Sequence, residues 1–170
     1  MSRAYAEGTS VPVDRSKGEI DALLSKHGAT QRGIVADDAD GRAMVAFVIG
    51  GRHYRLDLPM PKLSDMPDPT KGTWQLPKGT AVHARWNAWS PEQRRAHLRD
   101  QLDQRCRERW RAVVLMLKAK LELVRIGVST VEKEFMSDLV IRGRTVGQML
   151  EEQMEQLLQG EAPRLLPEST

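Results

Sequence analysis

A chain of 170 residues is long enough for one domain with a hydrophobic core of its own. Its single cysteine, Cys106, excludes an internal disulfide framework. No apolar run approaches the length that crosses a membrane, and the first residues lack the hydrophobic segment of a signal peptide. We therefore expect a cytoplasmic protein that makes no membrane contact.

The modest net charge of +3 is unevenly distributed along the chain. Residues 91–126 carry 10 basic and 5 acidic side chains, whereas residues 127–170 carry 4 basic and 8 acidic ones. A basic segment suggests a polyanionic partner, and the acidic C-terminal part could face it from the same chain or from a neighbouring subunit.

The N-terminal half alternates between helix and strand signals. Residues 1–15 have little periodicity and are predicted to form an extended arm. Ser16 and Glu19 form a capping-box pattern ahead of a short helix from Lys17 to His27. The period then changes from helical to alternating, and tight-turn signals at Asp40-Gly41 and Gly50-Gly51 separate three strands. These strands are expected to begin at Ile34 and to cover 44–49 and 52–58, as an antiparallel meander with one buried face.

The second half is organised around one long helix. Residues 59–89 are proline-rich and form a long loop. An apolar stripe then recurs every three or four residues across residues 91–126, with Ser90 as the cap and Gly127 as the stop. Such a helix is about 50 Å long at 1.5 Å per residue. Two short helices should follow, the first holding Phe135 to Val140 and the second capped by Thr145, before a flexible acidic tail at 161–170.

The predicted fold is therefore α+β, with a single domain at residues 16–160. It holds a short N-terminal helix, a three-stranded antiparallel β-meander, one long amphipathic helix and two short C-terminal helices. The apolar stripe of the long helix is longer than such a small sheet can bury, so other residues must cover the remainder. Either the C-terminal helices or a second subunit could supply it, and we carry a homo-oligomer forward as the expectation.

Two features of the basic helix are typical of nucleic-acid binding. Arg107, Arg111, Lys118 and Arg125 fall in one narrow sector, where a ribbon of positive charge would match a row of phosphates. Upstream, Trp86 and Trp89 interleave with Arg95 and Arg99, which would place stacking rings beside cations. The alternative interpretations are a solvated helix face for the ribbon and a loop anchored by its tryptophans for the second segment.

Catalytic and metal signatures are missing from the sequence. The histidines at 27, 53, 83 and 97 are scattered, and Cys106 has no partner at ligand spacing. The acidic run at 37–41 lacks the ligand positions of a calcium loop and is better explained as a hairpin turn. No phosphate-binding glycine loop or nucleophile motif occurs. We expect neither an enzyme nor a bound metal or cofactor.

Three segments carry a resemblance to known proteins. They are YAEGTSVPVDRSK at 5–17, RWRAVVLMLKAKLELV at 109–124 and GRTVG at 143–147. Together they resemble an uncharacterised family of small bacteriophage and prophage proteins. The resemblance implies that a phage or prophage encodes the protein, and it assigns no role to individual residues. The predicted meander and long helix are also similar in architecture to the Rad52-like single-strand annealing proteins.

Two functions from different classes follow. The first is non-enzymatic binding of single-stranded DNA in phage recombination or replication. There Arg95, Arg99, Arg107, Arg111 and Lys118 would hold phosphates, and Trp86 and Trp89 would stack on bases. The second is a small phage protein that binds and inhibits or redirects a host protein, such as a component of antiviral defence. The interleaving of tryptophan and arginine favours the first.

Overall fold

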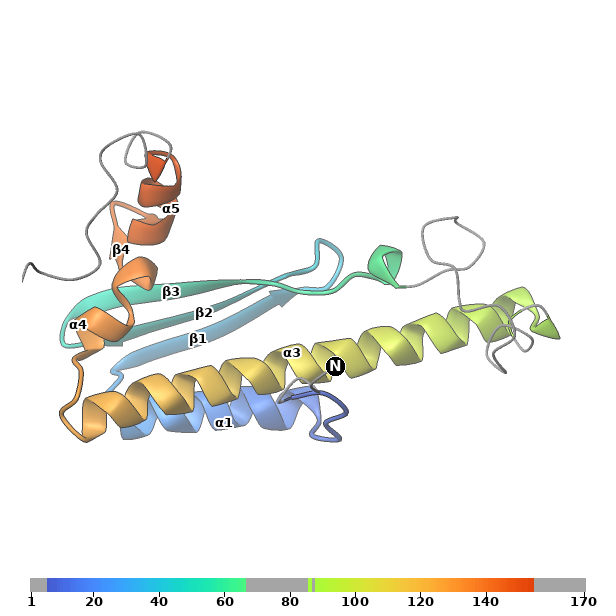
Figure 1. The fold of residues 1–170 in the computed structure, drawn as a ribbon, viewed down its shortest axis with the longest axis horizontal. Coiled ribbons are helices and arrows are strands. Elements are labelled where there is room, and N and C mark those ends of the chain that lie inside the picture. Colours follow the sequence, from blue (N-terminus) through green and yellow to red (C-terminus); the bar gives the residue numbers. More distant parts are fainter. Residues whose placement is uncertain (1–5, 67–85, 87, 155–170) are drawn as a thin grey trace, which may run out of the picture.

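A three-stranded sheet lies on a pair of helices, and a small C-terminal unit stands on the sheet's other face (Figure 1). The computed structural model describes residues 6–66, 86 and 88–154. The main elements are α1 (Val13–Lys26), β1 (Gln31–Asp37), β2 (Arg42–Ile49), β3 (Arg52–Pro59) and α3 (Pro91–Arg125). The shorter ones are η1 (Leu63–Asp65), α4 (Val131–Glu134), η3 (Met136–Asp138), β4 (Val140–Ile141), β5 (Arg144–Thr145) and α5 (Val146–Glu151).

The meander forms because side chains alternate along each strand and glycines close both hairpins. The strand order is β1-β2-β3, and both pairings are antiparallel. Gly50 and Gly51 both have positive φ in the second hairpin. In the first, Gly41 has a φ of 60°, and a Cβ there would lie 2.8 Å from the carbonyl oxygen of Met60. Only glycine therefore fits that turn without strain.

The core lies between the sheet and the two helices. The face toward the helices carries Phe47 and Tyr54, whose rings stack with centroids 5.3 Å apart. Phe135, just after α4, meets Phe47 edge-on at 5.4 Å. Leu117 and Leu121 of α3 are fully buried against this group. Large aromatic and aliphatic side chains thus supply most of the burial that holds the layers together.

Only the C-terminal half of α3 takes part in this core. Its buried residues begin at Trp110 and end at Leu121. The segment 91–109 extends well beyond the sheet, which Figure 1 shows as the yellow-green end of the helix. Both helix ends are as predicted. Ser90 and Gln93 form the capping box, and Gly127 follows the last turn with a φ of 75°.

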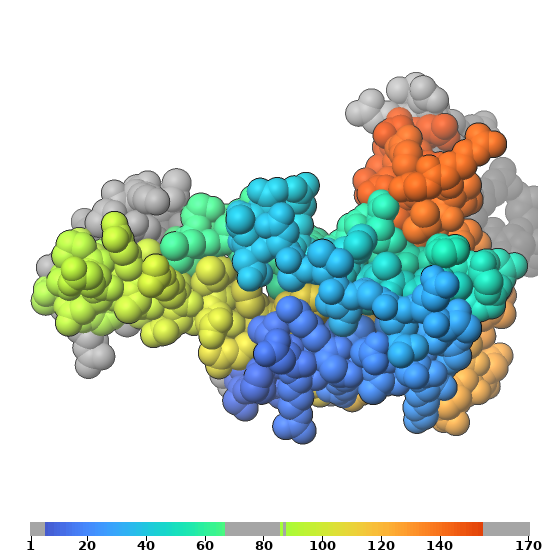
Figure 2. Space-filling view, turned by 180° about the vertical axis from the view of Figure 1, so that it is seen from behind, coloured from blue at the N-terminus to red at the C-terminus, as the bar shows by residue number. Residues whose placement is uncertain are grey.

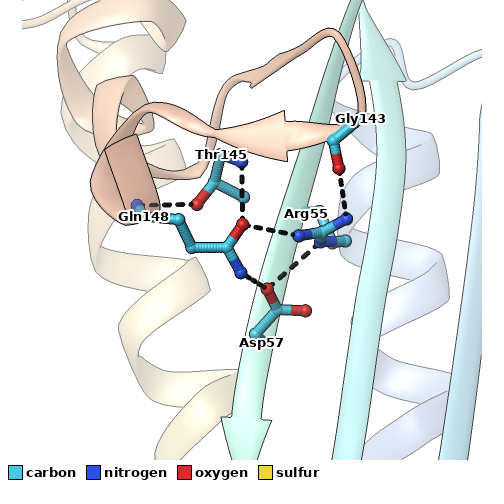
Figure 3. A network of polar contacts seen from close by, with 5 residues as sticks. All are labelled: Arg55, Asp57, Gly143, Thr145 and Gln148. Carbon is cyan, nitrogen blue, oxygen red and sulfur yellow. Dashed lines mark hydrogen bonds and ion pairs between the residues drawn. The ribbon is translucent and has the colours of Figure 1, made fainter. Parts of the chain in front are cut away.

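A polar network ties the C-terminal unit (β4, β5 and α5) to the outer face of the sheet, which is the face away from α1 and α3 (Figure 3). The Arg55 guanidinium donates to the Gly143 carbonyl oxygen at 3.1 Å, to Gln148 Oε1 at 2.9 Å and to Asp57 Oδ2 at 3.1 Å. Gln148 also donates to Asp57 at 3.0 Å and accepts the Thr145 N–H at 3.1 Å. One arginine therefore joins strand, hairpin turn and helix.

The α+β prediction is confirmed, with three corrections at element ends. The first helix begins at Val13 rather than Lys17, so the predicted arm 1–15 is too long. Ser16, expected to cap the helix, is fully buried inside it. Val13 packs against the core, and this tertiary burial lengthens the helix beyond its local start signal. β1 begins at Gln31 rather than Ile34, because pairing with β2 continues through polar residues.

The third correction concerns residues 136–145. The helix predicted to hold Phe135 to Val140 is a single turn, α4, followed by η3. Val140 instead belongs to the hairpin β4–β5, whose turn has positive φ at Arg142 and Gly143. The second predicted helix is present as α5 with its Thr145 cap. Most of the predicted loop 59–89, at 67–85 and 87, and the tail 161–170 lie outside the described residues.

Replacing Arg55 with Met should release the C-terminal unit from the sheet, because its two charge-assisted bonds to that unit, to Gly143 and Gln148, are lost together. We expect backbone amides of residues 140–151 to exchange hydrogen about tenfold faster, while those of β2 change little. Hydrogen exchange followed by mass spectrometry measures both. The matched control is Arg144→Met, since the side-chain partners of Arg144 among the described residues, Glu152 and the Gln148 carbonyl, belong to the C-terminal unit or directly follow it. Equal acceleration in both variants would contradict this role of Arg55.

Candidate nucleic-acid interface

The N-terminal half of α3 presents a face of arginines beyond the sheet. Arg95 and Arg99 are each 18 residues before a core residue, Val113 and Leu117, and 18 residues are five helical turns. Their side chains therefore project from the same side of α3 that packs into the core at Val113 and Leu117. Because the sheet ends before this segment, both arginines are exposed.

Two further arginines, Arg105 and Arg109, extend this face. At 100° per residue the four arginines fall within about 120° of the helix surface, over about 21 Å of its length. All four are exposed, and none makes an ion pair with any residue that the structure describes. We call Arg95, Arg99, Arg105 and Arg109 the arginine face.

The same sector of the helix contains no carboxylate. The acidic residues of this half of α3 project elsewhere on the same helical wheel, and they are Glu92, Asp100, Asp103 and Glu108. The Glu108 carboxylate is engaged by the Gly8 N–H at 2.8 Å and by Gln104 at 3.0 Å. Glu92, Asp103 and Glu108 nevertheless lie three or four positions from Arg95, Arg99 and Arg105, so they reduce the positive field at the margins of the arginine face. Half-buried Leu98, Leu102 and Cys106 lie between the arginines.

A hollow adjoins the arginine face. Arg105 and Arg109 line it together with Gln101 and Ala112 of α3, and Pro61 lies across from them. Gln104 and Glu108 of α3 and residues 6 and 7 complete its lining, and two of these residues, Glu7 and Glu108, are acidic. The guanidinium groups of Arg105 and Arg109 share this hollow with two carboxylates, so its charge is mixed rather than purely positive.

The predicted ribbon has a different environment, because each of its cations faces a carboxylate. Arg107 pairs with Asp103 at 2.9 Å, and Arg125 donates to Glu122 at 2.8 Å. Arg111 lies 2.5 Å from a Glu19 oxygen, and Lys118 contacts the other oxygen of the same carboxylate. The ribbon is thus largely occupied with ion pairs, two of which fix α1 to α3.

The Glu19 carboxylate serves two cations. Its hydrogen bond with Lys118 has the largest effect and lowers the pKa of Glu19. Burial raises that pKa, and the hydrogen bond and charge of Arg111 lower it again, so the net shift is downward. The Glu19 side chain is 28 % exposed, so solvent screens these pairs only in part. Glu19 is therefore a clamp between α1 and α3 as well as a counter-charge to the ribbon.

The two predicted stacking tryptophans differ in access. Trp86 is 3 % exposed, and the Arg94 guanidinium lies 5.7 Å from its ring centroid while donating to the Trp86 carbonyl at 3.0 Å. Its Nε1 has no hydrogen-bond partner among the described residues. Trp89 is half-buried, with its ring centroid 4.9 Å from that of His97. Trp89 therefore keeps part of its side chain accessible to solvent, whereas Trp86 is buried at the helix start.

Sequence reasoning found Arg95 and Arg99 but did not select Arg105 and Arg109. A signal was available. Arg107 has Asp103 four residues earlier, the spacing of a helical ion pair, whereas Arg109 has no acidic residue three or four positions away on the helix. The pairing of Arg111 and Lys118 with Glu19 spans about ninety positions of sequence and had no local signal.

Other chemistry is sparse in the part of the chain that the structure describes. No three metal-ligating side chains come together there in a group that could hold an ion. Burial raises the pKa of the Cys106 thiol, which disfavours the reactive thiolate. Within the same described ranges, no helix is long and apolar enough to cross a membrane.

Comparison of the chain with protein-family models, with curated proteins and with solved structures finds no significant match.

Replacing Glu19 with Gln should lower the free energy of unfolding by about 1 kcal/mol at pH 7, because α1 loses its two ion pairs to α3. The folded-state pKa of Glu19 is depressed, so this stability is present above about pH 4.5 and is lost as pH falls through the folded pKa. Urea unfolding at pH 7 and pH 3 should therefore show the wild type and the variant converging in acid. Asp103→Asn is the control, since an exposed pair should contribute little. A constant gap between wild type and Glu19→Gln at all pH values would contradict the assignment.

Proposed function

We propose that this protein binds single-stranded DNA through the arginine face at the projecting end of α3. The observation that carries the proposal is the cluster of four exposed arginines in a helix sector without a carboxylate. Neutralising phosphates and releasing their counterions supplies most sequence-independent affinity for nucleic acid. At a rise of 3.4 Å per nucleotide, the 21 Å of the face corresponds to about six nucleotides.

The surroundings of the face support a single strand over a duplex. Leu98, Leu102 and Cys106 interleave with the arginines, and Trp89 lies half-exposed near the helix start. Aromatic groups stack on the faces of bases most readily when those bases are unpaired and turned toward the protein. Arg107, Arg111 and Lys118, with their carboxylate partners, would add less to phosphate binding than the arginine face.

Such binding needs no catalysis and no cofactor. In keeping with the phage resemblance, a protein of this kind would act in the host cytoplasm on strands exposed during recombination or replication. Annealing of complementary strands is the further activity to test once binding is measured.

The decisive variant changes all four residues of the arginine face to Gln, which keeps helix propensity. Fluorescence anisotropy with labelled single-stranded DNA should show affinity about 100-fold weaker at low salt. The slope of log K against log salt should fall by about 3, since each phosphate contact on a single strand contributes roughly 0.7. Duplex DNA and RNA, measured in parallel, should bind the wild type more weakly than single-stranded DNA does.

The charge-matched control also replaces four arginines with Gln, but uses those that are paired with carboxylates elsewhere. They are Arg42, Arg52, Arg125 and Arg144. This control should bind nearly as well as the wild type. Equal loss in both variants would show attraction by net charge alone and would refute the site. A wild-type chain that binds no nucleic acid at low salt would refute the function and favour the alternative of a host-protein partner.

A further inference from the structure

The two edge strands of the sheet, β1 and β3, differ in how far other residues cover their outer backbone groups. The β3 edge is covered at one end, where Tyr54 and Leu139 form an antiparallel bridge to the C-terminal unit. β1 is the opposite edge and pairs only with β2 among the described elements. Six of its seven residues are exposed and Ile34 is half-buried. The blue segment that holds β1 lies at the surface beside α1 in Figure 2. Its outer backbone groups are therefore open to another strand.

β1 also lacks the devices that usually protect an edge strand. It contains no proline and no lysine, and its register with β2 continues without a bulge from Gln31 to Asp37. Its two charged side chains are both engaged by other groups of the same chain. Arg32 is bound to Asp21 at 2.7 Å, and Asp37 accepts the backbone N–H groups of its own turn. Neither charged side chain therefore protects the open edge of β1 from pairing with another strand.

We propose that two copies of this chain pair antiparallel through β1, about a twofold axis at Ile34, and so form one continuous six-stranded sheet. In this register Arg32 lies opposite the partner's Ala36, and Gln31 lies opposite the partner's Asp37. No like charges oppose one another. A parallel pairing in register would instead place Arg32 against Arg32 and Asp37 against Asp37, which is unfavourable.

The side chains on the outer face are complementary in the same register. Gly33 lies opposite the partner's Val35, and the symmetry repeats this contact on the other side of the axis. Val35 is 56 % exposed in the single chain, and the space where Gly33 would carry a Cβ is empty within 4 Å. Each Val35 can therefore fill the space above the opposite glycine. Ala46 and Met44, the β2 neighbours of Gly33 and Val35, extend this apolar strip across both copies.

This pairing concerns a different surface from the arginine face and does not depend on DNA binding. Sedimentation of the full chain without nucleic acid, at roughly 100 µM, should give a species of twice the 19.2 kDa chain mass. Changing Gly33 and Val35 together to Lys should raise the dimer dissociation constant about tenfold or more, because four like charges then meet around the axis. Gly33→Glu with Val35→Glu should do the same.

Mixing the two double variants provides the specific test. Each Lys at 33 or 35 then opposes a Glu of the other chain, so a mixed dimer should form where neither variant dimerises alone. The control Val128→Lys adds charge at a 69 % exposed position after α3 and should leave the wild-type dimer intact. Circular dichroism checks that all variants are folded.

Three outcomes would overturn the proposal. They are a monomeric wild type, a dimer that survives both double variants, and failure of the mixture to form the mixed dimer. If the wild type is monomeric and added oligonucleotide protects the β1 amides from hydrogen exchange, then the β1 edge binds nucleic acid instead of a second copy of the chain.

Discussion

The contact between the C-terminal half of α3 and the inner face of the sheet determines the rest of the structure. Leu117 and Leu121 lie fully buried against Phe47, Tyr54 and their neighbours. The sheet is about eight residues long in its longest strands, whereas α3 has 35 residues. A strand of that length spans about 27 Å, and the helix about 52 Å. Roughly half of the helix must therefore lie beyond the core, whatever its sequence there.

This mismatch in length explains how the chain distributes its charge. Where α3 is packed, its basic flank meets α1, and the Glu19 carboxylate pairs with Arg111 and Lys118. Where α3 projects, no second helix among the described residues lies alongside to supply counter-charges, and the arginine face stays exposed. The same amphipathic pattern thus produces an internal clamp at one end and a candidate phosphate-binding surface at the other.

The sheet is asymmetric as well. Arg55 fixes the C-terminal unit over the outer face near β3, so that edge and part of that face are covered within the chain. The β1 side has no such cover among the described elements. The proposed pairing of two copies would complete the sheet on its open side and would place two projecting arginine faces in one assembly. Two linked binding surfaces hold a long strand more tightly than either does alone.

The sequence by itself determined the elements whose signals are local. The capping box at Ser90, the stop at Gly127 and the alternation of β2 and β3 each depend on neighbouring residues. The first two were found where predicted, and the two strands within two residues of their predicted ends. Arg95 and Arg99 were also selected from the sequence, and the structure shows both exposed on the part of α3 that extends beyond the sheet. Only the tertiary structure decided which cations are engaged by carboxylates, because the partner of Arg111 and Lys118 lies on another helix far away in sequence. It likewise decided that Trp86 is buried, that α1 begins at Val13 and that residues 140–145 form a hairpin. Each of these features depends on which other residues pack against the segment. The hydrophobic pattern within a segment does not identify those tertiary contacts.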